Sequence, residues 1–176
     1  MKYKLSEIAD IISGGTPKKK VKEYWHGNIP WITIKDFKGK YVNTCTGYIT
    51  QIGLENSSTN LTEDDDILIS ARGTVGELVM AKKGMTFNQS IYALRVKRSI
   101  ADPSYIYYWL SHNINELKKG VHGSVFDTIT KKTFDLIRVN LPSLEVQQEI
   151  AQHFSLFDRK IALNRQINAN LFSCLK

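Results

Sequence analysis

Three polar segments within residues 67–94 contain the side chains that most often contact nucleic acids. The stretch reads ILISARGTVGELVMAKKGMTFNQSIYAL, and between its apolar runs stand Arg72, Lys82, Lys83, Asn88 and Gln89. Arg, Asn and Gln form bidentate hydrogen bonds with base edges, and Lys neutralises phosphates. Ordinary turn chemistry explains the same residues, and this stretch alone favours that interpretation.

The glycines of this stretch predict hairpin turns and no nucleotide-binding loop. A P-loop needs G-x-x-x-x-G-K-[ST] and a dinucleotide loop needs G-x-G-x-x-G, and neither pattern occurs. Gly73 and Gly76 stand between two strand-like runs, which is the setting of a hairpin. The Gly-x-x-Gly of KH domains instead lies between helices. We therefore expect Arg72 and Thr74 at one hairpin tip and the two lysines at the next.

An earlier stretch, SGGTPKKKVKEYW at residues 13–25, suits contacts with a nucleic-acid backbone. Two glycines allow close backbone approach, and three consecutive lysines follow a threonine, although such a run is often only a solvated loop. We expect this stretch to hold phosphates and the turns at Arg72 and at residues 88–89 to contact bases. The candidate nucleic-acid-binding residues are Thr16, Lys18, Lys19, Lys20, Trp31, Lys35, Arg72, Gly73, Thr74, Lys82, Lys83, Asn88 and Gln89.

The net charge of +7 is unevenly distributed along the 176 residues. Residues 1–40 and 67–100 are basic, whereas residues 41–66 contain five acids and no Lys or Arg. Clustered Lys and Arg neutralise phosphates and release counterions, so a basic surface is typical of nucleic-acid binding. A solubilising surface explains the same excess equally well, and charge alone does not choose between the two.

Composition indicates a soluble globular protein, and we expect it in the cytoplasm, without a cofactor and away from membranes. Hydrophobic residues make up 42% of the chain and charged residues 23%. No apolar run approaches the roughly 20 residues that span a bilayer, and the charged N-terminus is not typical of a signal peptide. Cys45 and Cys174 form neither a disulfide framework nor a metal-binding pattern.

Constellations of catalytic residues are missing from the sequence, so we expect no catalysis. The four histidines are far apart in the chain and none has a second ligand nearby, so no metal site is expected. No G-x-S-x-G motif occurs. Asp36-Phe37-Lys38 faintly resembles the Asp-x-Lys of metal-dependent nucleases, but we interpret Asp36 as a turn residue at a strand end. A small metal-dependent DNA nuclease or DNA-modifying enzyme is the alternative function.

The hydrophobic pattern predicts a mixed α+β domain in residues 1–142. A short helix is predicted from Leu5 to Ile12, capped by Ser6, and a longer one in residues 101–120. Residues 41–62 are predicted to be loop with short strand pieces. Segments rich in β-branched and aromatic residues predict strands at residues 29–37, 67–71, 77–81, 91–96 and 137–142.

Residues 143–176 differ in kind and predict a long helix of coiled-coil type. They contain no Gly or Pro, and apolar residues recur at alternating spacings of four and three. A helix of this length would reach about 50 Å, too long for a compact small domain, so we place a boundary at Pro142–Ser143. The narrow stripe favours a partner helix over the alternative, a helix folded back on the domain. The predicted seam is Ile150, Phe154, Phe157, Ile161, Asn164, Asn168, Leu171 and Leu175.

Four short motifs, in their order along the chain, resemble the specificity subunit of type I restriction–modification enzymes. They are Gly-Gly-Thr-Pro at residues 14–17, Ser-x-Arg-Gly-x-x-Gly at 70–76, Asn-Gln-Ser at 88–90 and Leu-Pro-x-x-x-x-Gln-x-x-Ile at 141–150. Each motif is weak alone, but together they are quite specific. The resemblance covers nearly the whole chain.

The resemblance implies a non-catalytic, sequence-specific DNA-binding subunit. In this family, target recognition domains bind double-stranded DNA, and long helices join them and hold methyltransferase subunits. Residues 1–142 would be the target recognition domain, and residues 143–176 the helix for dimerisation and methyltransferase docking. Family members usually have two domains and two helices, so the chain resembles half a subunit. We expect a homodimer that reads a bipartite site, with the methyltransferase and restriction subunits as further partners.

Overall fold

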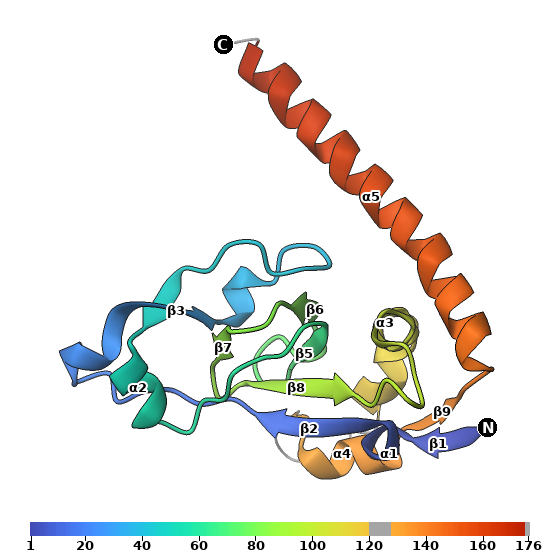
Figure 1. The fold of residues 1–176 in the computed structure, drawn as a ribbon, viewed down its shortest axis with the longest axis horizontal. Helices are drawn as coiled ribbons and strands as arrows, with labels where there is room; N and C mark the ends of the chain where they lie inside the picture. The colour runs from blue at the N-terminus through green and yellow to red at the C-terminus, as the bar shows by residue number, and fades with distance from the viewer. Residues whose placement is uncertain (120–127, 175–176) are drawn as a thin grey trace.

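The chain folds into a mixed helix-and-strand domain from which one long C-terminal helix extends (Figure 1). The computed structural model describes residues 1–119 and 128–174. In chain order the elements are β1 (Lys2–Lys4), α1 (Leu5–Ile8), β2 (Ala9–Ser13), η1 (Lys22–Tyr24), β3 (Trp25–Ile32), η2 (Ile34–Asp36), β4 (Gly47–Ile49), α2 (Gln51–Glu55), β5 (Asp66–Ser70), β6 (Leu78–Ala81), β7 (Thr86–Phe87), β8 (Ile91–Val96), α3 (Pro103–Lys119), α4 (Lys131–Leu136), β9 (Arg138–Asn140) and α5 (Leu144–Cys174).

A four-stranded antiparallel sheet in the order β2-β8-β5-β6 forms the centre of the domain. Every residue of β5, which reads DILIS, is buried. Its middle residues, 67–69, are all apolar rather than alternating with polar residues, because both faces of the sheet are covered. Ile67 and Ile69 pack on one side with residues of α1, α3 and α4, and Leu68 packs on the other side.

A three-stranded sheet in the order β4-β3-β7 contributes to the core on the second side. Its middle strand, β3, pairs antiparallel with β4 and parallel with β7. Ile32 of β3 and Phe87 of β7 are fully buried in the same core as Leu68 and Ala93 of the central sheet. This pairing places Trp31 of β3 close to the turn that follows β7.

Hydrogen bonds attach the start of α5 to the domain. β1 pairs with β9, and the amino group of Met1 donates a 2.8 Å hydrogen bond to the carbonyl oxygen of Leu141. Gln147, one turn into α5, is almost fully buried. Its side chain donates a 3.0 Å hydrogen bond to the carbonyl of Pro142 and accepts one of 3.0 Å from the backbone nitrogen of Asp102. This residue is the Gln of the fourth sequence motif.

Beyond its first turns, α5 leaves the domain (Figure 1). Its 31 residues correspond to about 46 Å at the usual rise per residue. Ala151 is buried against the domain, whereas every residue from 159 to 171 is exposed. The second half of the helix is therefore not folded back on its own domain.

Most predicted elements agree with the observed ones. The predicted strands at residues 67–71, 77–81 and 91–96 correspond to β5, β6 and β8, and the two long helices correspond to α3 and α5. The strand predicted at residues 29–37 begins earlier, at Trp25, and ends at Ile32. The predicted loop after it also contains the short helix α2, which the pattern did not indicate.

The prediction of one helix from Leu5 to Ile12 is wrong, because α1 ends four residues early and β2 follows directly. Ile11 and Ile12 point to opposite faces of β2 and pack against the two different cores, as neighbours in a strand do. All five residues of β2 pair with β8, and this pairing overrides the local helical pattern. The predicted cap, Ser6, instead donates a 2.5 Å hydrogen bond to Asp135.

Candidate nucleic-acid interface

Three of the four sequence motifs meet at one end of the four-stranded sheet. β2 ends with Ser13 opposite Tyr92 of β8, and β5 ends with Ser70 opposite Ile91. The segments that follow β2 and β5 and the segment that precedes β8 therefore emerge at the same end. We call this end the recognition edge, and its polar side chains that are not fully buried include Thr16, Arg72, Thr74, Asn88 and Gln89.

The two glycines of the Gly-Gly-Thr-Pro motif fit closely against neighbouring backbone. A Cβ atom on Gly14 would lie 2.0 Å from the carbonyl oxygen of Asn88, and one on Gly15 would lie 2.3 Å from the nitrogen of Thr59. The nitrogen of Gly15 also donates a 2.9 Å hydrogen bond to the carbonyl of Phe87. The close approach is thus made to the chain's own backbone, and it fixes the start of the loop at the recognition edge.

Thr16 and Gln89 are joined across the recognition edge, because the Thr16 hydroxyl donates a hydrogen bond to the side-chain oxygen of Gln89. The same loop is supported by Trp31, whose Nε1 donates a 3.0 Å hydrogen bond to the carbonyl of Gly15. The ring of Trp25 packs edge to face on Trp31, with centroids 5.1 Å apart. The indole N–H of Trp31, a predicted contact residue, therefore holds the loop in place.

The hairpin between β5 and β6 presents Arg72 and Thr74 to solvent. The buried Ser70 hydroxyl donates a hydrogen bond to the carbonyl of Thr74 and accepts one of 2.8 Å from the nitrogen of Glu77. The motif's two glycines have φ angles of 73° and 87°, which favour glycine. Arg72 has no hydrogen-bond or ion-pair partner in the described part of the chain. Sequence reasoning missed Ser70, although a serine that ends a buried apolar run was a usable signal.

Three lysines beside the recognition edge are exposed and unpaired. Lys18, Lys19 and Lys20 follow the buried Pro17, and none forms an ion pair with any residue that the structure describes. The side-chain oxygen of Asn88 accepts a 2.9 Å hydrogen bond from the nitrogen of Ser90, which leaves the amide nitrogen available. The edge therefore offers free cations and free amide donors together.

Lys82 and Lys83 lie at the opposite end of the sheet from Arg72. β6 begins beside the Arg72 hairpin and ends at Ala81, so the turn with both lysines follows at the far end. The Nζ of Lys83 is 3.1 Å from a carboxylate oxygen of Glu63. The structure does not bring these two lysines to the recognition edge. The predicted Lys35 is exposed on η2, directly after β3.

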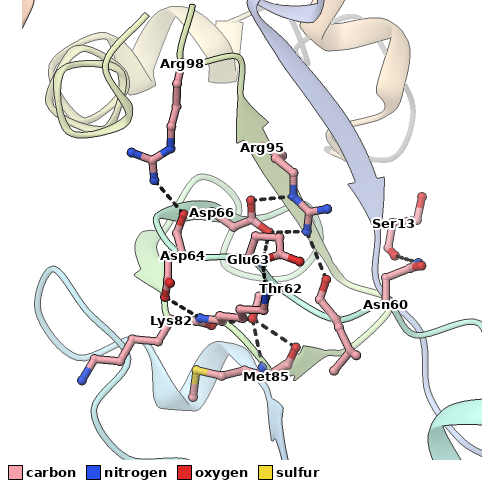
Figure 2. A network of polar contacts seen from close by, with 12 residues as sticks. Ser13, Asn60, Thr62, Glu63, Asp64, Asp66, Lys82, Met85, Arg95 and Arg98 are labelled. Atoms are coloured by element: carbon pink, nitrogen blue, oxygen red, sulfur yellow. Dashed lines mark hydrogen bonds and ion pairs between the residues drawn. The ribbon is translucent and has the colours of Figure 1, made fainter.

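The acidic segment of residues 63–66 engages the basic side chains at that far end (Figure 2). Arg95 donates hydrogen bonds of 3.1 and 2.8 Å to the buried carboxylate of Asp66, and these raise the pKa of Arg95. Arg98 donates to the carbonyl of Asp64 and to the carboxylate of Asp65. Much of the positive charge of residues 67–100 is therefore neutralised internally, and Arg72 and Lys82 are its cations without an acidic partner in the described part of the chain.

Asp36 is a structural turn residue, as predicted, rather than a candidate metal ligand. Its buried carboxylate accepts hydrogen bonds from the backbone nitrogen and hydroxyl of both Thr33 and Thr46, at 2.8 to 3.1 Å. Among the residues that the structure describes, no three His, Cys, Asp or Glu side chains lie close enough to hold a metal ion. In the same residues, no helix is both long and apolar enough to cross a membrane.

The predicted seam of α5 is exposed over most of its length. Phe154, Phe157, Ile161 and Leu171 are 49–63% exposed, which leaves apolar side chains of the seam in solvent. Asn164 and Asn168 are exposed in line with it, and Ile150 is half-buried near the domain. The last member, Leu175, lies outside the described residues.

A second apolar stripe on α5 was not anticipated from the sequence. Leu156, Leu163 and Ile167 are 46–55% exposed and follow each other at spacings of seven and four residues, so they share one face. At 3.6 residues per turn, this face is rotated by about 100° from the seam. A partner helix on the seam would leave the second stripe in solvent.

Comparison with known proteins places these features in a family. Residues 1–172 match the family model of the type I restriction modification DNA specificity domain. The specificity subunit of the type I restriction enzyme MjaIX from Methanocaldococcus jannaschii is 30% identical over 169 residues, which are 94% of this chain and 39% of that protein. The EcoR124I/EcoR124II specificity subunit from Escherichia coli is 32% identical over 162 residues, 88% of this chain and 40% of that protein. The chain thus spans about 40% of the length of these curated relatives.

Solved structures share the fold. A chain from a structure on complex assembly and conformational transition of the type I R-M system aligns with a TM-score of 0.75 at 24% identity, over 97% of this chain and 41% of that chain. The HsdS subunit from Thermoanaerobacter tengcongensis aligns with a TM-score of 0.70 at 23% identity, over 95% and 39%. At these identities the likeness concerns the fold alone, a mixed domain followed by a long helix.

Proposed function

Since the chain belongs to the type I restriction modification DNA specificity family, we propose that it selects the DNA sequence on which a type I restriction–modification complex acts. Residues 1–142 are the target recognition domain, and residues 143–176 form the helix that sets spacing and binds partners. The observation that carries the proposal is the meeting of three distant motifs at the recognition edge, beside three unpaired lysines. The protein works with DNA in the cytoplasm.

Base recognition is assigned to Arg72, Thr74, Asn88 and Gln89. Arg72 is exposed without an internal partner, so its guanidinium can pair with a guanine edge. The side-chain oxygen of Gln89 accepts a hydrogen bond from the Thr16 hydroxyl. This bond orients the Gln89 amide and leaves its nitrogen available as a donor. Hydrogen bonds within the hairpin and loop hold the backbone that carries these side chains in place before DNA arrives, which lowers the entropy lost on binding.

Phosphate binding is assigned to Lys18, Lys19 and Lys20. Exposed lysines without a carboxylate partner break no ion pair when they approach a phosphate, and each contact releases counterions. They stand two to four residues after Thr16, so a backbone strand beside the bases can reach them. Trp31 supports the loop that contains Thr16 through its hydrogen bond to Gly15. Gly73 supplies the positive φ angle of the hairpin between β5 and β6.

The α5 seam is proposed to pair with the α5 helix of a second copy of this chain. An exposed apolar stripe of this length favours a partner. A two-fold interface is self-complementary, so one stripe can serve both chains, and Asn164 and Asn168 can set the register. An antiparallel pair would place the two recognition domains at opposite ends, so that the dimer reads a bipartite, palindromic DNA site.

The second stripe is proposed to hold a methyltransferase subunit. Leu156, Leu163 and Ile167 remain exposed after the seam is paired, and exposed apolar side chains that share one helix face are typical of a docking surface. The restriction subunit would join the complex through the methyltransferase. In this arrangement catalysis belongs to the partners, and this chain supplies recognition and spacing.

A small metal-dependent nuclease is the weaker alternative. The only feature that indicated it, Asp36, has both carboxylate oxygens engaged by Thr33 and Thr46. Incubation of plasmid DNA with the purified chain and divalent metal would separate the two functions. Metal-dependent cleavage or modification by the chain alone would support the alternative.

Selection of bound duplexes from a random library, with the methyltransferase subunit present, tests the proposed function. We expect one enriched bipartite sequence with a constant spacer. The same selection with Arg72→Ala and Gln89→Ala together should enrich a degenerate sequence at the affected positions. Recovery of random sequences by the unmodified chain would contradict a role in sequence selection.

A further inference from the structure

A groove of about 1000 Å³ lies where the long helix leaves the domain. One wall is the segment of residues 38–43 with Lys82, and the other wall is α5 from Ser155 to Arg165. Tyr107 and Ser104 of α3 also line it. The groove is separate from the recognition edge, since Lys82 follows the far end of β6.

The groove is lined by cations that have no internal partner. Lys38, Lys82, Arg159 and Arg165 all line it and are exposed, and none of them pairs with a carboxylate in residues 1–119 or 128–174. At the same end of the sheet, Lys83, Arg95 and Arg98 differ, because each of them has an acidic partner. Positive charge has thus been left uncompensated at the groove, where five basic side chains gather around one carboxylate.

The single carboxylate of the groove is already engaged. Asp158 accepts a 2.5 Å hydrogen bond from the Tyr108 hydroxyl and lies 3.8 Å from Nζ of Lys40. Lys40 is held in turn by Tyr108, to whose hydroxyl it donates a 2.8 Å hydrogen bond, and its side chain is only 10% exposed. Lys40, Tyr108 and Asp158 are thus bonded to one another, whereas the other four basic side chains of the groove have no such partner among the residues that the structure describes.

We infer that this groove binds backbone phosphates of the DNA segment between the two half-sites. The inference rests on the proposed function. A duplex that reaches recognition domains at both ends of a helix pair must run along α5, past the junction where the groove lies. The described residues that line the groove include Lys and Arg side chains but no turn of the kind that presents Arg72 or Gln89. Such cations bind backbone phosphates, which are the same in every DNA sequence. The groove would therefore raise affinity without adding sequence preference, and would select for a continuous duplex in the spacer.

Removal of the four free cations tests the inference. The groove variant combines Lys38→Gln, Lys82→Gln, Arg159→Gln and Arg165→Gln, all at exposed positions, so the fold should persist. The control variant combines Lys2→Gln, Lys131→Gln, Lys132→Gln and Arg138→Gln, which are exposed on β1, α4 and β9 and change the net charge equally. Both are compared with the unmodified chain on a labelled random-sequence duplex of about 30 base pairs, by fluorescence anisotropy at several salt concentrations.

The groove variant should bind the duplex less tightly than the unmodified chain. Its slope of log-affinity against log salt should also be smaller in magnitude, by as many as ~3–4 units. The control variant should differ by less than about one unit. Equal changes in both variants, or no change in the groove variant, would overturn the inference while leaving the proposed function intact. A groove variant that keeps its salt slope but no longer binds the methyltransferase subunit would assign the groove to that protein instead. Absence of salt-dependent binding by the unmodified chain would overturn the proposed function itself.

Discussion

The Tyr108 hydroxyl of α3 donates a 2.5 Å hydrogen bond to Oδ2 of Asp158 in α5, at the point where the long helix leaves the domain. Nζ of Lys40 lies 4.3 Å from the centroid of the Tyr108 ring. The Phe154 ring packs against the same Tyr108 ring, with the two ring centroids 5.0 Å apart. Together with the buried Gln147, this contact fixes the direction of α5 relative to the domain. If α5 sets the spacing of two recognition domains, its direction sets the spacer of the DNA site.

Tyr108→Phe should loosen the helix without unfolding the domain. The change removes both hydrogen bonds of the hydroxyl, the one to Asp158 and the one from Lys40, but keeps the ring contacts, so we expect a loss of about 1–3 kcal/mol in the free energy of unfolding. Spin labels at the exposed positions Ser99 and Gln166 should give a broader distance distribution than in the parent, with unlabelled chain in excess. An unchanged distribution would mean that Gln147 alone determines the direction of α5.

The same tyrosine should make the fold sensitive to alkaline pH. Burial, followed by the hydrogen bond to Asp158, raises the pKa of Tyr108 above the usual value of 10.0. Above about pH 10 the unfolded chain loses this proton while the folded chain keeps it, so the free energy of unfolding falls as pH rises. Denaturant unfolding between about pH 9 and 11 should therefore show a shallower decline for Tyr108→Phe than for the parent. Identical slopes would contradict this assignment.

Replacement of Lys18, Lys19 and Lys20 by Ala should weaken DNA binding equally on all sequences. Each phosphate contact adds about 0.9 to the slope of log-affinity against log salt, so the slope should fall by as many as ~3 units. Lys2→Ala with Lys131→Ala and Lys132→Ala is the matched control. If affinity and slope of the loop variant equal those of this control, the three lysines are only a solvated loop.

Arg72→Ala should weaken binding to the preferred site more than binding to random DNA. A bidentate contact with a base is worth about 1–3 kcal/mol of discrimination, and random duplexes lose only the charge. Arg72→Lys keeps the charge but not the paired donors, so it should lose discrimination while retaining most non-specific affinity. Competition binding with both duplexes measures the difference. Equal losses on both duplexes would make Arg72 a phosphate contact.

Ile161→Asp together with Leu171→Asp should convert a dimer into a monomer. Both side chains are about half exposed on the seam, so the substitutions leave the domain core intact and place charges in the proposed interface. Sedimentation equilibrium should show a dimer for the parent chain and a monomer for the variant. Leu163→Asp, on the second stripe, is the control and should leave the dimer intact. A parent chain that remains a monomer at high concentration would contradict pairing through α5.

Gly14→Ala should destabilise the recognition edge. The new Cβ atom would meet the carbonyl oxygen of Asn88 at 2.0 Å, so the loop or the neighbouring turn must shift. Overpacking of this kind costs about 1–3 kcal/mol, and the loss should appear in denaturant unfolding. Affinity for the preferred DNA site should fall as well, because the Thr16–Gln89 contact is displaced. Unchanged stability and affinity would show that the loop is free to move.

Strong local patterns were sufficient to predict several elements from the sequence by itself. The apolar runs at residues 67–69 of β5 and 91–94 of β8 are stronger patterns than turns or loops show. The same holds for the amphipathic helix α3 and for the uninterrupted heptad spacing of α5. The hairpin at Gly73 and Gly76 follows from the same reasoning, since glycines between two strands provide the positive φ angles that the turn requires. The residue motifs also sufficed to indicate the family.

Only the tertiary structure decided where the motifs lie relative to one another. Thr16 and Gln89 are far apart in sequence and meet because β2 pairs with β8, the same pairing that turned Ile11 and Ile12 from a predicted helix into a strand. Strand direction likewise carried Lys82 to the end opposite Arg72, although both belong to one stretch of sequence. Local propensity acts over a few residues, whereas strand register and the burial of both sheet faces are set by contacts between distant segments. The recognition edge, the groove and the Tyr108–Asp158 contact all depend on such distant pairs.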